Sequence, residues 1–99
     1  MRIEWTRWAV DQWLKTFEYL ESENAPAALR IAQSIFEVVN MLADHPLAGR
    51  KGMIAGTREF AVPRSPFIIA YEVNRSSDTL TIITVFDGRR RWPSAFPKD

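Results

Sequence analysis

The fold is decided by the stretch FIIAYEVNRSSDTLTIITVF at residues 67–86. Its two ends are rich in Val, Ile, Phe, Tyr and Thr, which favour strands, and the polar residues 74–78 between them indicate a hairpin loop. We therefore predict strands at 67–73 and 79–86. The second carries apolar side chains on both faces, which indicates a central strand: Leu80, Ile82, Ile83 and Val85.

Upstream, the pattern still has a period of two. Arg58, Phe60 and Val62 alternate with their neighbours and indicate a further strand, and Pro63 and Pro66 bracket the turn that follows. Before it, residues 44–56 contain one proline and three glycines, and we predict a loop there. The core of this loop, Gly49-Arg50-Lys51-Gly52, places two cations on a flexible turn.

The first half of the chain has helical periodicity after a short predicted strand at Arg2–Trp5. Thr6 and Asn24 are predicted N-caps of two helices, and the second helix is expected to end near Ala43, because His45 precedes a proline. Two apolar stripes at helical spacing support this prediction: Val10, Trp13, Leu14, Phe17 and Leu20, then Ala28, Ile31, Ala32, Ile35, Val38, Val39 and Leu42.

The element order is thus β-α-α-β-β-β. We expect an α+β fold in which a helical hairpin packs on a small, mostly antiparallel, twisted sheet. The length of 99 residues predicts a single domain, 1–99.

Composition argues against several functional classes. The chain has no cysteine and one histidine, so we expect no metal site, and its four glycines form no phosphate loop or dinucleotide fingerprint. We expect no small-molecule cofactor. The N-terminus lacks the features of a signal peptide, and no apolar run approaches the ~20 residues of a membrane span. These observations indicate a cytoplasmic protein with no membrane association.

The charge distribution is uneven although the net charge is +1. Residues 1–49 carry 4 basic and 7 acidic side chains, whereas residues 50–99 carry 9 basic and 5 acidic ones. A chance fluctuation in a short chain is one interpretation. The functional interpretation is a basic face for an anionic or protein partner, with these candidate binding residues: Arg50, Lys51, Arg58, Arg64, Arg89, Arg90, Arg91 and Trp92.

The strongest local feature is Gly88-Arg89-Arg90-Arg91-Trp92-Pro93, directly after the central strand. Three adjacent guanidinium groups cannot all be buried, and their planar forks suit phosphate or carboxylate. Trp92 either stacks on a base or covers the sheet edge. We expect the other listed cations to converge with this cluster.

Candidates for acid–base chemistry are few. His45 is the one side chain whose unperturbed pKa lies near neutrality, and a structural role after the helix is the favoured interpretation. Glu59 and Asp87 lie beside arginines in sequence and are favoured as charge partners over general bases. No complete catalytic set is visible, so an enzymatic activity stays open.

Four motifs in order resemble the RelE/ParE superfamily of toxins from bacterial type II toxin–antitoxin modules. They are Leu42-x-x-x-Pro46-x-x-Gly49-Arg50, Gly56-Thr57-Arg58-Glu59-Phe60, Ser65-Pro66-Phe67-Ile68-Ile69-Ala70-Tyr71 and Val85-Phe86-x-Gly88-Arg89-Arg90-x-Trp92-Pro93. The resemblance covers nearly the whole chain and implies a growth-arresting toxin, as in plasmid-stabilisation modules, with a cognate antitoxin as partner.

The superfamily divides into RelE-like toxins, which cleave messenger RNA on the ribosome, and ParE-like toxins, which inhibit DNA gyrase. By this resemblance Arg90 and Arg58 match cations of the RelE pattern, but Ile68 and Phe96 stand where an arginine and a tyrosine are expected. The resemblance therefore favours a ParE-like gyrase inhibitor. The alternatives are a ribosome-dependent endoribonuclease using Arg58, Arg90 and Glu59, or a non-toxic protein-interaction module.

Overall fold

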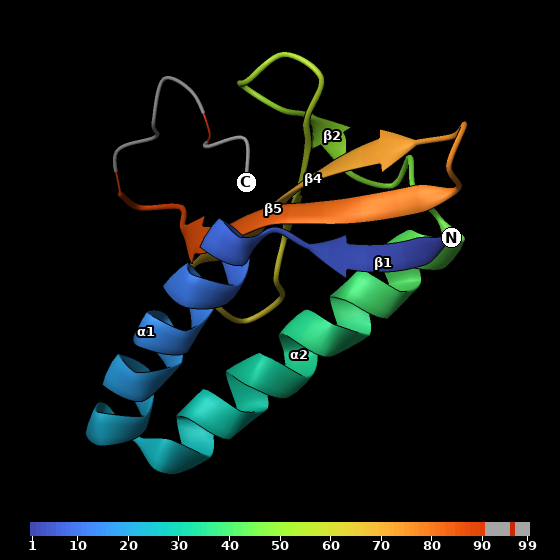
Figure 1. Ribbon diagram of the computed structural model, residues 1–99. Helices are drawn as coiled ribbons and strands as arrows, with labels where there is room; N and C mark the ends of the chain where they lie inside the picture. Colours follow the sequence, from blue (N-terminus) through green and yellow to red (C-terminus); the bar gives the residue numbers. More distant parts are fainter. Residues whose placement is uncertain (91–95, 97–99) are drawn as a thin grey trace.

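The computed structural model describes residues 1–90 and residue 96. Its elements are β1 (Arg2–Trp5), α1 (Arg7–Glu23), α2 (Ala25–Asp44), β2 (Arg50–Lys51), β3 (Arg58–Ala61), β4 (Phe67–Asn74) and β5 (Thr79–Asp87). The two helices form a layer on one side of the sheet, and β2 lies at the border of the sheet farthest from β1 (Figure 1). The predicted α+β architecture is confirmed.

The five strands are arranged in the order β1-β5-β4-β3-β2. β1 is parallel to β5, and the other neighbouring pairs are antiparallel. β5 lies between β1 and β4, so the prediction of a central strand is confirmed. Most of its side chains are buried, as its apolar residues on both faces predict.

The helices begin where capping chemistry predicts. The Thr6 hydroxyl accepts a hydrogen bond from the Ala9 amide at 3.0 Å and donates one to the Ile83 carbonyl at 3.0 Å. The Asn24 side chain accepts a bond from the Ala27 amide at 3.1 Å. Each cap satisfies an amide that has no partner inside the helix, and Thr6 also fixes α1 to β5.

The core lies between the helical hairpin and the inner face of the sheet. Its fully buried side chains include Ile35 and Leu42 from α2 and Ile69, Tyr71 and Leu80 from the sheet. Trp13 of α1 packs edge-on against Phe67 at the start of β4, with ring centroids 6.2 Å apart. These contacts hold both helices against the inner face of the sheet.

One prediction about the fold is wrong. Residues 44–56 were expected to form a loop, but Arg50 and Lys51 form the edge strand β2. Arg50 lies opposite Glu59 and Lys51 opposite Arg58, and the Gly52 amide donates to the Thr57 carbonyl at 2.8 Å. The sequence predicts a loop here because glycines are typical of turns, whereas the strand β2 forms only through its pairing with β3.

Candidate functional site

The first basic group of the sheet consists of Arg50, Lys51 and Arg58 on β2 and β3, and a buried carboxylate anchors it. Glu59 of β3 is only 2% exposed, and its Oε1 accepts a hydrogen bond from Arg50 Nε at 3.1 Å. Arg50 Nη2 lies 3.0 Å from the same oxygen, and Glu59 Oε2 accepts from the Met53 amide at 2.8 Å. Glu59 therefore ties β2 and the turn after it to β3.

A buried hydroxyl holds the chain just before β2. Tyr71 of β4 is fully buried; its hydroxyl accepts from the Gly49 amide at 2.9 Å and donates to the Pro46 carbonyl at 2.8 Å. Arg58 Nη1 donates to the Gly49 carbonyl at 2.7 Å. Burial raises the pKa of Tyr71, and the Gly49 hydrogen bond and Arg58 oppose that rise. Arg58 is thus engaged in holding the backbone.

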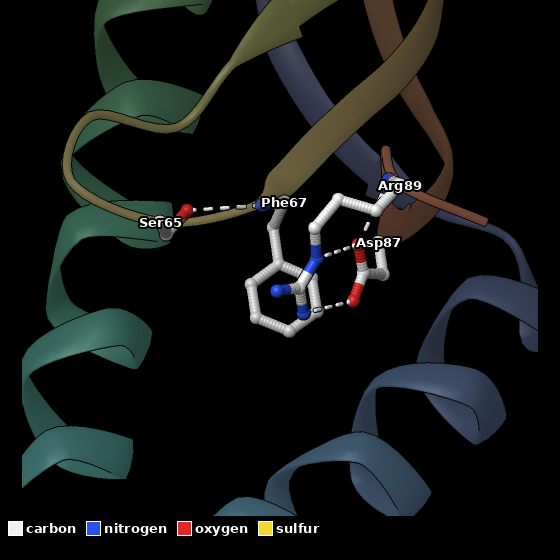
Figure 2. A network of polar contacts seen from close by, with 4 residues as sticks. All are labelled: Ser65, Phe67, Asp87 and Arg89. Atoms are coloured by element: carbon white, nitrogen blue, oxygen red, sulfur yellow. Dashed lines mark hydrogen bonds and ion pairs between the residues drawn. The ribbon is translucent and has the colours of Figure 1, made fainter.

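The second basic group lies at the end of β5, opposite the start of β4. Asp87 is paired with Phe67 in the sheet register, and Arg89 folds back onto Asp87 (Figure 2). Two side-chain bonds join them, Nε–Oδ1 at 3.0 Å and Nη2–Oδ2 at 2.7 Å, and the Arg89 amide also donates to Oδ1 at 2.9 Å. The hydrogen bonds from Arg89 lower the pKa of Asp87 to about 2.

This pair gives a pH-dependent stability. The folded pKa of Asp87, about 2, lies below the ordinary value of 3.8, so its stabilisation is complete above the ordinary value and is lost as the pH falls toward 2. We expect Asp87→Asn to unfold at a lower temperature than wild type at pH 7. This difference should shrink between pH 4 and pH 2 in thermal scans followed by circular dichroism.

The matched control for this prediction is Arg89→Gln, which should show the same pH dependence because it removes the other half of the pair. The effect should be small, since the Arg89 side chain is 77% exposed. A difference that stays constant from pH 7 to pH 2 would exclude the pair as its source.

The structure brings the predicted cations into two groups instead of one. Arg50, Lys51 and Arg58 lie on β2 and β3, whereas Arg64, in the turn from β3 to β4, lies at the sheet end that also carries Arg89 and Arg90. Arg58 lies opposite Tyr71, and Tyr71 is four residues along β4 from Phe67, which faces Asp87. That spacing is about 13 Å along the sheet. The expected convergence is therefore wrong for Arg50, Lys51 and Arg58, which lie farther along the sheet, whereas Arg64 does lie at the same sheet end as Arg89 and Arg90.

Arg91 and Trp92, which were also predicted to bind a macromolecule, lie outside the described residues. Arg64 adopts a left-handed backbone conformation with φ 57° and is exposed. Lys51 and Arg90 are exposed as well. Within the described ion pairs, Arg50 and Arg89 have carboxylate partners, and Lys51, Arg64 and Arg90 have none.

Both carboxylates that were considered as proton carriers are charge partners, as the sequence favoured. Glu59 binds Arg50, and Asp87 binds Arg89. His45 is the exposed C-cap residue of α2, and its amide donates to the Met41 carbonyl at 2.8 Å. Across residues 1–90 and residue 96, no cluster of three His, Asp or Glu side chains is placed to hold a metal ion. No described helix combines the length and the apolarity needed to cross a membrane.

A groove of about 1160 Å³ lies beside the Asp87–Arg89 pair, between α1 and the end of β5. Trp8, Tyr19 and Phe67 contribute aromatic surface to its lining, and Lys15, Arg89 and Arg90 contribute cations. Phe96 also lines it, and its ring lies 5.8 Å from that of Trp8. The groove therefore combines apolar walls with a cationic component.

Two residues that position the first basic group, on β2 and β3, were not singled out as candidates from the sequence. Gly49 and Tyr71 occur in the motifs quoted above, but the hydrogen bond between them joins residues 22 positions apart. The one available signal was a hydroxyl within the apolar run 67–73, because a buried hydroxyl requires a partner.

Comparison with known proteins gives a consistent result. Residues 3–92 match the family model described as "ParE toxin of type II toxin-antitoxin system, parDE". A protein of Sinorhizobium fredii (strain NBRC 101917 / NGR234) named "Putative toxin Y4kP" is 35% identical over 92 residues, which cover 93% of each chain.

Solved structures agree with this match. A chain from the "Chromosomal ParDE TA system from P. aeruginosa" superimposes with a TM-score of 0.75 at 26% identity, covering 88% of this chain and 95% of that one. The "YoeB/ParE toxin from Agrobacterium tumefaciens" shares the fold, with a TM-score of 0.59 at 22% identity over 86% of this chain and 96% of that one.

Proposed function

The chain belongs to the family of ParE toxins of type II toxin–antitoxin systems, and from this premise we propose that it arrests bacterial growth by binding and inhibiting DNA gyrase in the cytoplasm. A cognate antitoxin neutralises it. The toxin acts as a binding protein and cleaves no nucleic acid.

One observation carries the choice of binding over cleavage: the two carboxylates near the cations are both occupied. Glu59 is buried and accepts hydrogen bonds from Arg50 and the Met53 amide. The hydrogen bonds from Arg89 lower the pKa of Asp87 to about 2, so Asp87 is ionised near neutral pH. A general base works best with a pKa near the operating pH and within reach of the substrate proton. Asp87 fails the first condition because its pKa is about 2, and Glu59 fails the second because it is buried. This favours a surface that binds without proton transfer.

The cations available to the target are Lys51, Arg64 and Arg90, since they are exposed and have no partner among the described ion pairs. Arg64 and Arg90 share the sheet end beside the groove, because the Gly88 amide bonds the Pro66 carbonyl at 2.8 Å. An antitoxin segment bound in the groove would cover Arg90, which lines it. This arrangement supports neutralisation by masking of the binding surface.

The decisive experiment is a gyrase supercoiling assay with the purified chain. We expect saturating toxin to block supercoiling and Arg90→Ala to weaken the inhibition at least tenfold, because a contact to a charged group is worth about 1.5–3 kcal/mol. Only the backbone amide of Arg90 has a described hydrogen bond, to the Asp87 carbonyl, so the variant should keep the stability of the wild type to within about 0.5 kcal/mol.

Arg75→Ala is the matched control, since Arg75 is an exposed arginine in the β4–β5 turn at the opposite end of the sheet. It should inhibit as wild type does. Normal supercoiling at saturating toxin would overturn the proposal. Growth arrest accompanied by cuts inside codons, seen by primer extension, would assign the RNA-cleaving alternative, and harmless expression without an antitoxin would assign the interaction module.

A further inference from the structure

Among the described residues, the edge strand β1 has no strand partner on the side away from β5. The sheet order places β1 at one border, where no other strand lies beyond it in the described part of the chain (Figure 1). The Arg2 amide donates to the Asp78 carbonyl at 2.9 Å and the Thr6 amide to the Ile82 carbonyl at 3.0 Å. In a parallel pair, alternate residues bond the same neighbour, so the backbone groups of Ile3 and Trp5 point outward.

The side chains of β1 divide between two faces. Arg2 and Glu4 are exposed and lie 3.2 Å apart, whereas Ile3 and Trp5 are half-buried against the core. On the helix side, Phe36 of α2 is 54% exposed, and its ring centroid lies 6.4 Å from that of Trp5. The border of the sheet thus carries a pair of opposite charges on one face and an exposed aromatic side chain on the other.

We propose that a second copy of this chain pairs with β1, antiparallel and centred on Ile3. This register places Arg2 opposite Glu4 of the second copy and Glu4 opposite its Arg2, so that both cross-strand pairs have opposite charges. The two Ile3 residues face each other and exchange both of their outward backbone hydrogen bonds. The contact is isologous, because each copy contributes the same strand.

Charge complementarity selects this register over its neighbour. A pairing centred on Glu4 would place the two Glu4 carboxylates directly opposite each other, which is unfavourable. Charged side chains on an edge strand normally discourage association with other strands. Here the positive Arg2 and the negative Glu4 are two residues apart, so an antiparallel second copy of β1 places opposite charges across from each other.

The opposite border of the sheet does not offer the same match. β2 presents Arg50 and Lys51, so an antiparallel copy of β2 would bring cations opposite cations. In the β1 pairing, the two-fold axis is perpendicular to the sheet, and both helical hairpins lie on the same side. Phe36 of each copy then faces the junction and adds apolar contact to a short strand pairing.

Sedimentation equilibrium of the full chain tests this proposal. We expect reversible dimers within about 5–500 µM, because a four-residue strand and one aromatic contact form a small interface. Arg2→Glu and Glu4→Arg should each weaken the dimer at least tenfold, since each places like charges opposite one another. An equimolar mixture of the two variants should associate as wild type does, because their charges match across the junction.

These substitutions change exposed side chains only, and circular dichroism should show an unaltered fold. Wild type that stays monomeric throughout this range would overturn the proposal, and so would single variants that dimerise like wild type. A dimer that resists both charge reversals but is lost in Phe36→Ser would place the contact on the helices and equally exclude strand pairing. None of these readouts depends on gyrase.

Discussion

Replacing Gly49 by alanine is expected to lower the free energy of unfolding by about 3–5 kcal/mol, the sum of an overpacking term and a lost buried hydrogen bond. A Cβ at this position would lie 2.8 Å from both Tyr71 Cε1 and the Glu59 carbonyl oxygen, and closer still to the Tyr71 hydroxyl. Tyr71 is fully buried, and β3 is paired on both edges, so neither neighbour can move away.

Urea denaturation followed by circular dichroism measures this effect. For a chain of this size the loss corresponds to a fall in Tm of roughly 12–40 °C. Gly56→Ala is the matched control: it has φ 83° but nothing within 4 Å of an added Cβ, so it should cost only about 1 kcal/mol of backbone strain. Equal losses in the two variants would mean that the close approach at Gly49 is relieved without cost.

The same experiment separates packing from hydrogen bonding at this point. Adding Tyr71→Phe to Gly49→Ala removes the nearest atom but leaves Cε1 and the Glu59 carbonyl in place. The double variant should therefore remain as unstable as Gly49→Ala. Recovery toward wild type would show that the hydroxyl alone is responsible.

The second large effect is expected at Glu59. Replacing Glu59 by alanine removes the acceptor of the Met53 amide and of Arg50, and hydrogen bonds to charged groups contribute about 1.5–3 kcal/mol each. The net loss should be about 2–3 kcal/mol, since burying the carboxylate is itself unfavourable. Arg50 is 67% exposed and can turn to water, so it adds little cost.

Hydrogen exchange locates this effect. In Glu59→Ala the amides of Gly52 and Met53 should exchange faster relative to the core amides of β5, because Glu59 holds β2 and its turn against β3. The matched control is Glu72→Ala, which removes an exposed carboxylate from β4 and should change stability by less than about 0.5 kcal/mol. Similar losses at both positions would refute the anchoring role of Glu59.

Gly49 and Glu59 show why the sequence could not predict which cations of the basic surface are free. Each candidate arginine was identified by type and position, but type does not reveal whether a cation is free. Arg50 and Glu59 are nine residues apart on different strands, and Arg58 reaches the Gly49 carbonyl across the same interval. Such contacts exist only after β2 and β3 are paired, so the free and engaged cations could be separated only in the folded chain.

The sequence alone determined the elements whose signals are local. Side-chain periodicity and caps act within a few residues, and they placed both helices and β1, β3, β4 and β5 to within about two residues. The tertiary structure alone decided that Arg50–Lys51 is a strand, that Glu59 and Tyr71 are buried anchors, and that the cations form two groups. The reason is physical: a two-residue strand has no period, and the burial of a polar group depends on a partner supplied by a distant segment.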